Sequence, residues 1–284
     1  MQLRRLPDAI ESAAFLDRPA GALAGAVAAA VPAGPFKDAL SGTWLGHALH
    51  PALTDLPIGF WTSAWVLDHV GGRRSAPAAR TLVALGLLTA IPTAVAGAND
   101  WSDTDGPARR VGLVHATANS IAFACYAVSY VERRRGRRAR GILWGWLGAG
   151  AASAGGALGG HLVVALGIGV DHTTFEGRPA DWTVAGAAAD LVENRPVAMR
   201  ADGVPVLVYT DGDRLLALSD TCTHRGGPLH EGRIEAGCVV CPWHASAFRL
   251  EDGEVERGPA TRPQPRFEAR LRDGVVEVRA ARSA

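Results

Sequence analysis

The sequence is poor in several features that would narrow its class. It has only 4 cysteines in 284 residues, too few for a disulfide-stapled scaffold. Its 29 basic and 28 acidic residues leave a net charge of +1, so the overall charge gives no reason to expect binding to nucleic acid. Lysine is nearly missing, since Lys37 is the single one and every other basic residue is arginine. Alanine and glycine are also abundant, so we attribute the preference for arginine over lysine to codon usage.

Charged residues are also missing from three long stretches, 82–98, 111–131 and 141–170. A helix needs about 20 apolar residues to cross the core of a bilayer. These stretches therefore predict three membrane spans. A further span, the first along the chain, is predicted at 53–70, although Asp55, Asp68 and His69 lie near its ends. The alternative is a soluble bundle of buried helices.

The chain is expected to contain two domains of different fold class. We expect a tail at 1–50 with an interfacial helix at 20–31, an all-α domain of four transmembrane helices at 51–171, and a polar linker at 172–181. From 182 to 284 the sequence changes to short alternating runs that are broken by Asp-Gly pairs at 211–212 and 273–274. This pattern predicts an antiparallel all-β domain.

Two short segments of the β domain carry residues that bind metals. Cys222-Thr-His224 is followed by Cys241-Pro-Trp-His244. Two thiolates and two imidazoles can hold a tetrahedral zinc ion. They can also hold a [2Fe–2S] cluster, with both cysteines on one iron and both histidines on the other. The Cys-x-His spacing favours the cluster, because zinc sites usually begin with Cys-x-x-Cys.

These segments resemble the Rieske [2Fe–2S] family. The resemblance is carried by CTHRGGPL at 222–229, VVCPWH at 239–244, and the turns at 252–253 and 258–260. It implies a Rieske fold from Trp182 to Val278 and a [2Fe–2S] cluster as the cofactor. The implied ligands are Cys222, His224, Cys241 and His244.

The resemblance also identifies residues around the cluster. High-potential members have a disulfide between the ligand loops, and the matching positions here are Gly227 and Trp243. Phe248 replaces a tyrosine that donates to a ligand sulfur, whereas Ser246 is retained and can donate to a bridging sulfide. Hydrogen bonds to sulfur stabilise the reduced cluster. We therefore expect a midpoint potential in the lower part of the roughly −150 to +300 mV Rieske range.

Rieske oxygenases carry a second domain, in which two histidines and a carboxylate hold a mononuclear iron. Residues 245–284 are too few for that domain. We therefore expect an electron-transfer protein or an oxidoreductase component, and not a complete oxygenase.

The segment 42–59 resembles the start of a family of small bacterial four-span proteins of uncharacterised function, some of which are fused to Rieske domains. The likeness extends through 99–101, 110–115 and 159–161, with Ala48 in place of the usual proline. This resemblance implies no activity.

Antiparallel packing of four helices places a layer of ionisable side chains near one membrane face, on the side of the β domain. Such groups are costly in a membrane and suggest function. A quinol site, a b-type haem held by two histidines, and a purely structural layer of capped and hydrogen-bonded groups are the three interpretations. The layer consists of His47, His50, Asp55, His115 and His161.

Arginine-rich loops at 73–80 and 132–140 favour the cytoplasmic side. This places the Rieske domain on the outer face of a bacterial cell membrane. Arg137-Arg138 is either a twin-arginine export signal or part of an anchoring loop. The expected function is one-electron transfer at the bilayer surface, with a protein or a quinone as donor or acceptor. The alternatives are an oxidoreductase whose quinol or haem site feeds the cluster, and a redox sensor.

Overall fold

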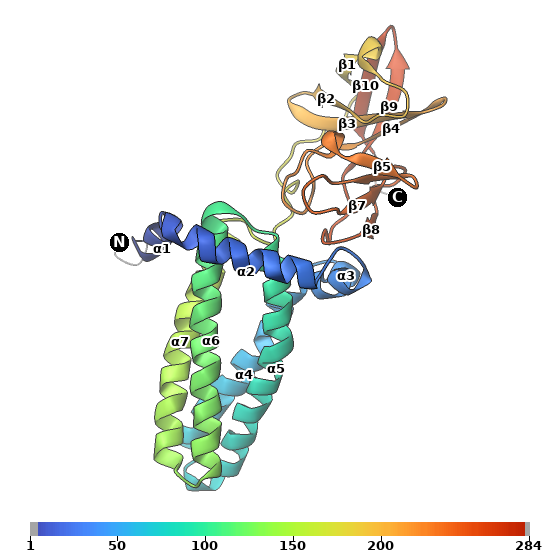
Figure 1. Cartoon of the computed structure of the whole chain (residues 1–284). Coiled ribbons are helices and arrows are strands. Elements are labelled where there is room, and N and C mark those ends of the chain that lie inside the picture. Colours follow the sequence, from blue (N-terminus) through green and yellow to red (C-terminus); the bar gives the residue numbers. More distant parts are fainter. Residues whose placement is uncertain (1–4, 282–284) are drawn as a thin grey trace. The chain divides into compact units, whose positions relative to one another are not determined.

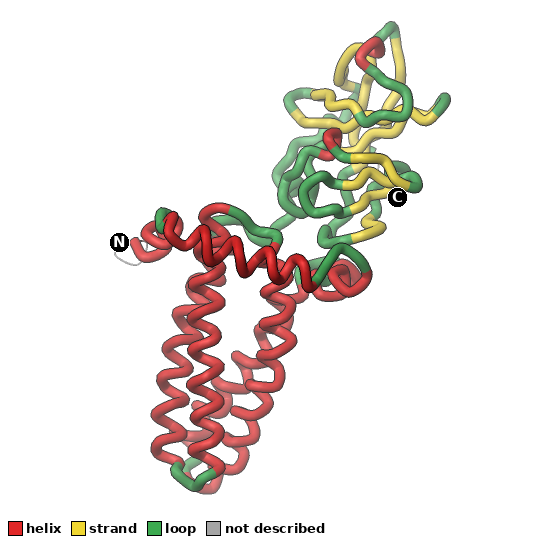
Figure 2. The backbone as a smooth tube through the Cα atoms, in the orientation of Figure 1, coloured by secondary structure: helices red, strands yellow, loops and turns green. Residues whose placement is uncertain are grey.

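The computed structural model describes residues 5–281, which separate into two compact units (Figure 1). The helical unit comprises the chain up to Val31 together with Ala48–Ile168. The β unit comprises Pro32–His47 and the chain from Gly169 onward. Figure 2 shows the corresponding change from helices to strands. The N-terminal helical region and the C-terminal all-β region are thus as predicted.

The helical unit contains two short helices followed by four long ones. Proline in the first turn of α5 and α6 suits the start of a helix, because its missing N–H has no intrahelical partner there. The helices are α1 (Arg5–Glu11), α2 (Asp17–Ala30), α4 (Leu49–Val70), α5 (Ala76–Ser102), α6 (Gly106–Arg134) and α7 (Arg138–Val164).

Three helical stretches are long and apolar enough to cross a membrane, namely Arg73–Ser102, Gly106–Arg134 and Arg138–Val164. The first two contain the uncharged stretches 82–98 and 111–131, and the third contains 141–164 of the stretch 141–170. The first predicted span also forms a helix, α4, but α4 is not among them. Asp55, Asp68 and two histidines lower its mean hydropathy.

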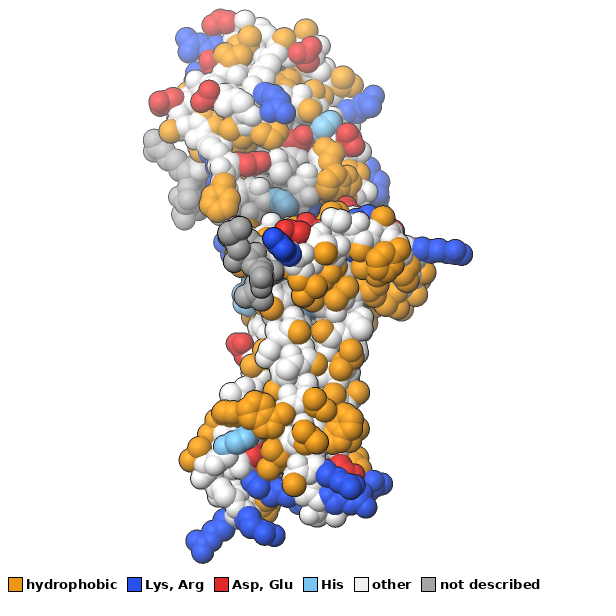
Figure 3. All heavy atoms as spheres, turned by 90° about the vertical axis from the view of Figure 1, so that its left-hand side faces the viewer, with side chains coloured by type: hydrophobic (Ala, Val, Ile, Leu, Met, Phe, Trp, Pro, Cys, Tyr) orange, Lys and Arg blue, Asp and Glu red, His pale blue; other side chains and the backbone are white. Residues whose placement is uncertain are grey.

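The surface of the helical unit is largely apolar along the bundle, and basic side chains gather at one end (Figure 3). Large apolar side chains such as Leu88, Ile91, Ile121 and Leu143 are more than half exposed. A water-soluble bundle would bury these side chains. A bilayer would cover them.

Small and helix-breaking residues have the roles expected of them inside such a bundle. Pro57 leaves the Leu53 carbonyl of α4 without its usual intrahelical donor, and the Thr93 hydroxyl of α5 donates to that carbonyl at 3.2 Å. A Cβ atom at Gly148 of α7 would lie 2.9 Å from the ring of Tyr126. Glycine at this position therefore allows α6 and α7 to approach closely.

A buried ion pair joins two of the long helices. Arg133 of α6 donates two hydrogen bonds to the carboxylate of Asp68 on α4, at 2.9 and 2.5 Å, and both side chains are at most 5% exposed. Arg138 at the start of α7 adds a hydrogen bond to the Asp68 carbonyl at 2.7 Å. One aspartate thus connects three helices at the end of the bundle.

The β unit has two antiparallel sheets, with strand order β1-β10-β9-β4-β3-β2 in one and β5-β6-β7-β8 in the other. Side chains from both sheets form one core, which includes Leu207, Leu218, Val239 and Phe248. The strands are β1 (Thr183–Ala187), β2 (Val197–Ala201), β3 (Val204–Asp211), β4 (Arg214–Ser219), β5 (Arg233–Glu235), β6 (Cys238–Val240), β7 (Ala247–Arg249), β8 (Val255–Arg257), β9 (Arg266–Arg272) and β10 (Val275–Ala280).

A segment from far upstream completes the β unit. It contains helix α3 (Pro35–Ser41) and the short turn Thr43–Leu45. The backbone N–H of Gly258 donates to the Asp38 carboxylate at 2.9 Å, and the Thr43 hydroxyl donates to the Ala260 carbonyl at 3.2 Å. The segment therefore packs on the turn at 258–260.

Candidate cluster site and histidine pair

The two Cys-x-His and Cys-x-x-His segments are loops that follow strands β4 and β6. Each loop is closed by backbone hydrogen bonds around its cysteine. In the first, Gly226 N–H donates to the Cys222 carbonyl at 2.8 Å, and Cys222 N–H donates to the Gly227 carbonyl at 2.9 Å. In the second, Ala245 N–H donates to the Cys241 carbonyl at 3.1 Å. These short local rings fix the backbone on either side of the two cysteines.

The loops bring the four expected ligand side chains together as two pairs. The thiol groups of Cys222 and Cys241 are hydrogen-bonded to each other and are almost completely buried. The rings of His224 and His244 lie 5.1 Å apart, with perpendicular planes, and both are half-buried. The cysteine pair thus lies in the core, while the histidine pair reaches the surface.

The electrostatics around the sulfurs favour a thiolate. Hydrogen bonding from Cys222, followed by the backbone N–H groups of Trp243 and His244, lowers the pKa of Cys241 to about 7. The same thiol contact and burial raise the pKa of Cys222 well above its usual value. Burial and the neighbouring His244 hold the pKa of His224 well below its usual range. One thiolate and a neutral imidazole are the forms that bind metal.

The residues fit a metal-bound group. In the described part of the chain, the Nδ1 atom of His224 is buried and has no hydrogen-bond partner, which is costly unless another group binds it. Gly227 leaves open the space beside the second loop, because a Cβ atom there would lie 3.0 Å from Cys241 Sγ and 3.0 Å from the Trp243 ring.

The three neighbouring residues singled out in the sequence lie close to the ligand loops. The Ser246 hydroxyl oxygen is fully buried and accepts a hydrogen bond from the backbone N–H of Ala260 at 3.0 Å, which leaves the hydroxyl hydrogen available to another acceptor. Phe248 is fully buried in the core. Trp243 is 52% exposed beside His244.

Several residues that support the site were missed by sequence reasoning. The buried Gln264 side chain accepts a hydrogen bond from Thr223 N–H at 3.2 Å and donates to the Ser219 carbonyl at 2.9 Å, so it holds the first ligand loop in place. Lys37 of α3 is 4% exposed, and its positive charge contributes to the low pKa of His224. Their partners are distant in sequence, so no local motif identifies them.

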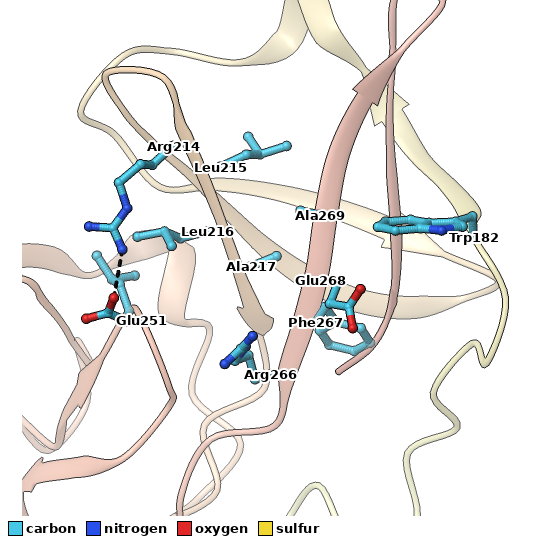
Figure 4. Close-up of a pocket in the computed structure, with 11 residues that line it drawn as sticks. Trp182, Arg214, Leu215, Leu216, Ala217, Glu251, Arg266, Phe267, Glu268 and Ala269 are labelled. Atoms are coloured by element: carbon cyan, nitrogen blue, oxygen red, sulfur yellow. Dashed lines mark hydrogen bonds and ion pairs between the residues drawn. The ribbon is translucent and has the colours of Figure 1, made fainter. Parts of the chain in front are cut away.

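A pocket of about 410 Å³ opens elsewhere on the β unit, against strands β4 and β9 (Figure 4). Trp182, Leu216 and Phe267 line it, and an ion pair of 2.9 Å joins Arg214 and Glu251 at its edge. None of the four expected ligands lines this pocket.

Comparison with known proteins identifies the β unit. Residues 181–268 match the Rieske [2Fe-2S] domain model. The chain is 38% identical over 74 residues to the anthranilate 1,2-dioxygenase ferredoxin subunit of Burkholderia cepacia, which covers 26% of this chain and 68% of that protein. It is 37% identical over 73 residues to ferredoxin CarAc of Metapseudomonas resinovorans, covering 25% and 68%. The chain belongs to the Rieske [2Fe–2S] family. Its cofactor is accordingly the [2Fe–2S] cluster, and the alternative of zinc is set aside.

A second part of the chain matches another family model. Residues 46–172 match a model described as predicted membrane protein (DUF2231). The protein is thus a Rieske ferredoxin-like electron-transfer domain fused to a predicted membrane domain with three candidate spans. Among solved structures, a complex of reduced oxygenase and oxidised ferredoxin in carbazole 1,9a-dioxygenase is 32% identical, with a TM-score of 0.33, over 36% of this chain and 96% of that one.

The predicted layer of ionisable groups in the helical unit is only partly brought together. His50 and His115 face each other with ring centres 6.3 Å apart. His161 is paired instead with Glu11 of α1, at 2.7 Å between Nε2 and Oε1. Asp55 is exposed on α4, and His47 lies in the β unit. A quinol site built from a histidine and Asp55 together gains no support from this arrangement.

Proposed function

We propose that this protein is a membrane-anchored Rieske protein that transfers single electrons at the membrane surface. The observation that carries the proposal is the division of the ligand residues into a buried cysteine pair and a partly buried histidine pair on two adjacent loops. Cys222, His224, Cys241 and His244 hold the cluster. Bound there, the [2Fe–2S] group supplies a centre that takes up and releases one electron.

The residues of the chain provide a surface for contact with a redox partner. His224 and His244 reach solvent, and the exposed indole of Trp243 lies beside them, with its ring centre 6.5 Å from that of His244. An exposed aromatic side chain is well suited to the centre of a small interface. A protein that docks over these three residues contacts the histidine side of the site. Donor and acceptor are proteins, such as an oxygenase or a reductase, or a quinone.

The helical unit serves as the anchor. Four spans, with α4 as the first, place the N-terminal tail and the Rieske domain on the same side of the bilayer. The α4–α5 and α6–α7 turns lie on the other side of the bilayer, and the arginines near them favour the cytoplasm. This supports an extracytoplasmic Rieske domain. An alkaline phosphatase fused after residue 284 is expected to be active, and activity of a cytoplasmic reporter alone would contradict this orientation.

The ligand assignment is tested by substitution in the full-length protein. Cys222→Ser, Cys241→Ser, His224→Ala and His244→Ala are each expected to abolish the Rieske EPR signal. Cys238→Ser is the matched control, because Cys238 is also a buried free thiol of the β unit, three residues before Cys241. A normal signal after any of the four ligand substitutions, or its loss in the control, would contradict the assignment.

Electron transfer itself is tested with the same protein. The dithionite-reduced protein is mixed with a one-electron acceptor, and reoxidation is followed by the cluster absorbance. A Trp243→Ala variant is expected to keep the spectrum and the midpoint potential while slowing reaction with a protein partner. Failure of the wild-type cluster to cycle reversibly would exclude the proposed function.

A further inference from the structure

Two histidines of the helical unit form a pair in which each ring is held by a neighbouring helix. His50 on α4 and His115 on α6 have ring centres 6.3 Å apart and planes that cross at 84°. The Nδ1 atom of His50 lies 2.9 Å from the Thr93 carbonyl oxygen on α5. The Nδ1 atom of His115 lies 2.7 Å from the Gly155 carbonyl oxygen on α7.

These contacts determine which nitrogen of each ring is available. A carbonyl oxygen can only accept a hydrogen bond, so each Nδ1 carries the proton. Each Nε2 is then unprotonated, and its lone pair can bind a metal ion. An imidazole whose N–H is anchored to a backbone carbonyl is the usual arrangement of a metal-ligating histidine, because the anchor fixes both the tautomer and the ring orientation.

We propose that His50 and His115 are the two axial ligands of a b-type haem. Two imidazoles that bind one metal ion from opposite sides, at about 2.0–2.1 Å each, have ring centres about 6–6.5 Å apart. The observed separation of 6.3 Å falls in that range. A tetrahedral zinc ion takes three or four protein ligands, whereas the iron of a haem receives four nitrogens from the porphyrin and needs only its axial ligands from the protein.

Two glycines let the neighbouring helices close against the rings. A Cβ atom at Gly97 of α5 would lie 2.6 Å from Nδ1 of His50, and one at Gly159 of α7 would lie 3.0 Å from Cε1 of His115. Any larger residue at Gly97 would displace the His50 ring from its carbonyl. The packing of α5 and α7 therefore fixes the directions of both imidazoles.

The side chain of Asn119 also contacts the pair. The amide nitrogen of Asn119 lies 3.2 Å from Nε2 and 3.4 Å from Nδ1 of His115, and it donates to the His115 carbonyl at 3.0 Å. Binding of iron to Nε2 replaces the amide contact at that atom, while the amide keeps its bond to the carbonyl. Asn119→Ala is accordingly expected to retain haem.

The test uses the full-length protein, purified in detergent from cells supplied with a haem precursor. We expect a Soret band and about one haem b per chain by the pyridine haemochrome method. His50→Ala and His115→Ala should each lower bound haem by more than roughly tenfold. His69→Ala is the control, since His69 lies on the same helix as His50 and its Nδ1 atom is hydrogen-bonded to the Trp65 carbonyl of that helix. Gly97→Leu should lower bound haem without removing a ligand.

The oxidised haem provides a second, independent measurement. Perpendicular axial planes leave two iron d orbitals nearly equal in energy, so the low-spin EPR spectrum should be strongly anisotropic, with one dominant low-field feature. Coplanar rings would give a rhombic spectrum instead.

The outcomes separate clearly, because the Rieske EPR signal reports the cluster independently of the haem. No Soret band, either as purified or after addition of haemin, would overturn the proposal while leaving the Rieske function intact. Retention of haem in both histidine variants would also overturn it. Stoichiometric quinone or zinc in place of haem would overturn it as well. A histidine variant that unfolds in SDS near the wild-type midpoint has a folded helical unit, so its haem content is interpretable.

Discussion

The hydroxyl of Ser246 is expected to affect two properties of the β unit at once. Its oxygen accepts the Ala260 N–H at 3.0 Å, and the side chain is completely buried. Its hydrogen is then free to donate toward a bridging sulfide of the cluster, as the family resemblance implies. Ser246→Ala removes both interactions with little change in volume.

The two effects can be given magnitudes. Without its acceptor, the buried Ala260 N–H should lower the free energy of unfolding by about 1–3 kcal/mol. A neutral hydrogen bond contributes about 0.5–1.5 kcal/mol. If the hydrogen bond from the Ser246 hydroxyl to the sulfide stabilises only the reduced cluster, its loss lowers the midpoint potential by about 20–65 mV for one electron. The midpoint potential falls, and does not rise, because the extra electron of the reduced cluster makes the sulfide a better hydrogen-bond acceptor.

The assay combines an EPR-monitored redox titration with chemical unfolding followed by visible circular dichroism. Ser219→Ala is the matched control. Ser219 is also completely buried, and its hydroxyl donates to Glu176 Oε2 at 2.8 Å. This control should lose stability and keep its potential. If Ser246→Ala is destabilised to the same extent and its potential does not fall, then the hydroxyl does not donate to the cluster and the reasoning is refuted.

Three further predictions concern charged side chains. Asp68→Leu should destabilise the helical unit by about 3–5 kcal/mol, because it leaves the buried Arg133 unpaired. The double variant Asp68→Leu with Arg133→Met should unfold in SDS near the wild-type midpoint. An equal loss of stability in both proteins would contradict this. Lys37→Met should lower the Rieske potential by roughly 20–60 mV, because a buried positive charge near His224 favours the reduced cluster; an unchanged or higher EPR midpoint would exclude that effect. Burial raises the pKa of Asp38, so the folded state binds its proton more tightly than the unfolded state, and this contribution to stability is lost as the pH rises from the ordinary aspartate range through the raised pKa. Asp38→Asn should lack that dependence in pH-dependent unfolding, and identical pH profiles would show that Asp38 does not carry it.

The ligand loops were predictable because their determinants are local. Cysteine, histidine and the glycine turns lie within a few residues of each other, and each loop closes by hydrogen bonds between near neighbours. The long helices were predictable for a related reason, since the absence of charge over 17 or more consecutive residues constrains any fold. The α4 helix was harder to assign because its Asp68 is neutralised by Arg133, about 65 residues away, which sequence reasoning did not identify.

The histidine layer shows where prediction from sequence ends. Helical rise gives the depth of a side chain in a bilayer, and this placed His50, His115 and His161 in one layer. Rotation about the helix axis depends on how the helices pack, and only this decides that His50 meets His115 while His161 meets Glu11. The pairing is therefore a tertiary property.

The contact between Asp38 and Gly258 spans 220 positions of the chain. Residues 32–47 leave the ribosome before all the long helices, yet their packing partners at 258–260 are made after them. The β unit is therefore discontinuous and cannot finish folding until the whole membrane domain has been synthesised. A fragment that begins at 169 would also lack Lys37, Asp38 and Thr43. Dissection of this protein for spectroscopy should accordingly keep both pieces, since an isolated C-terminal fragment would report on a different cluster environment.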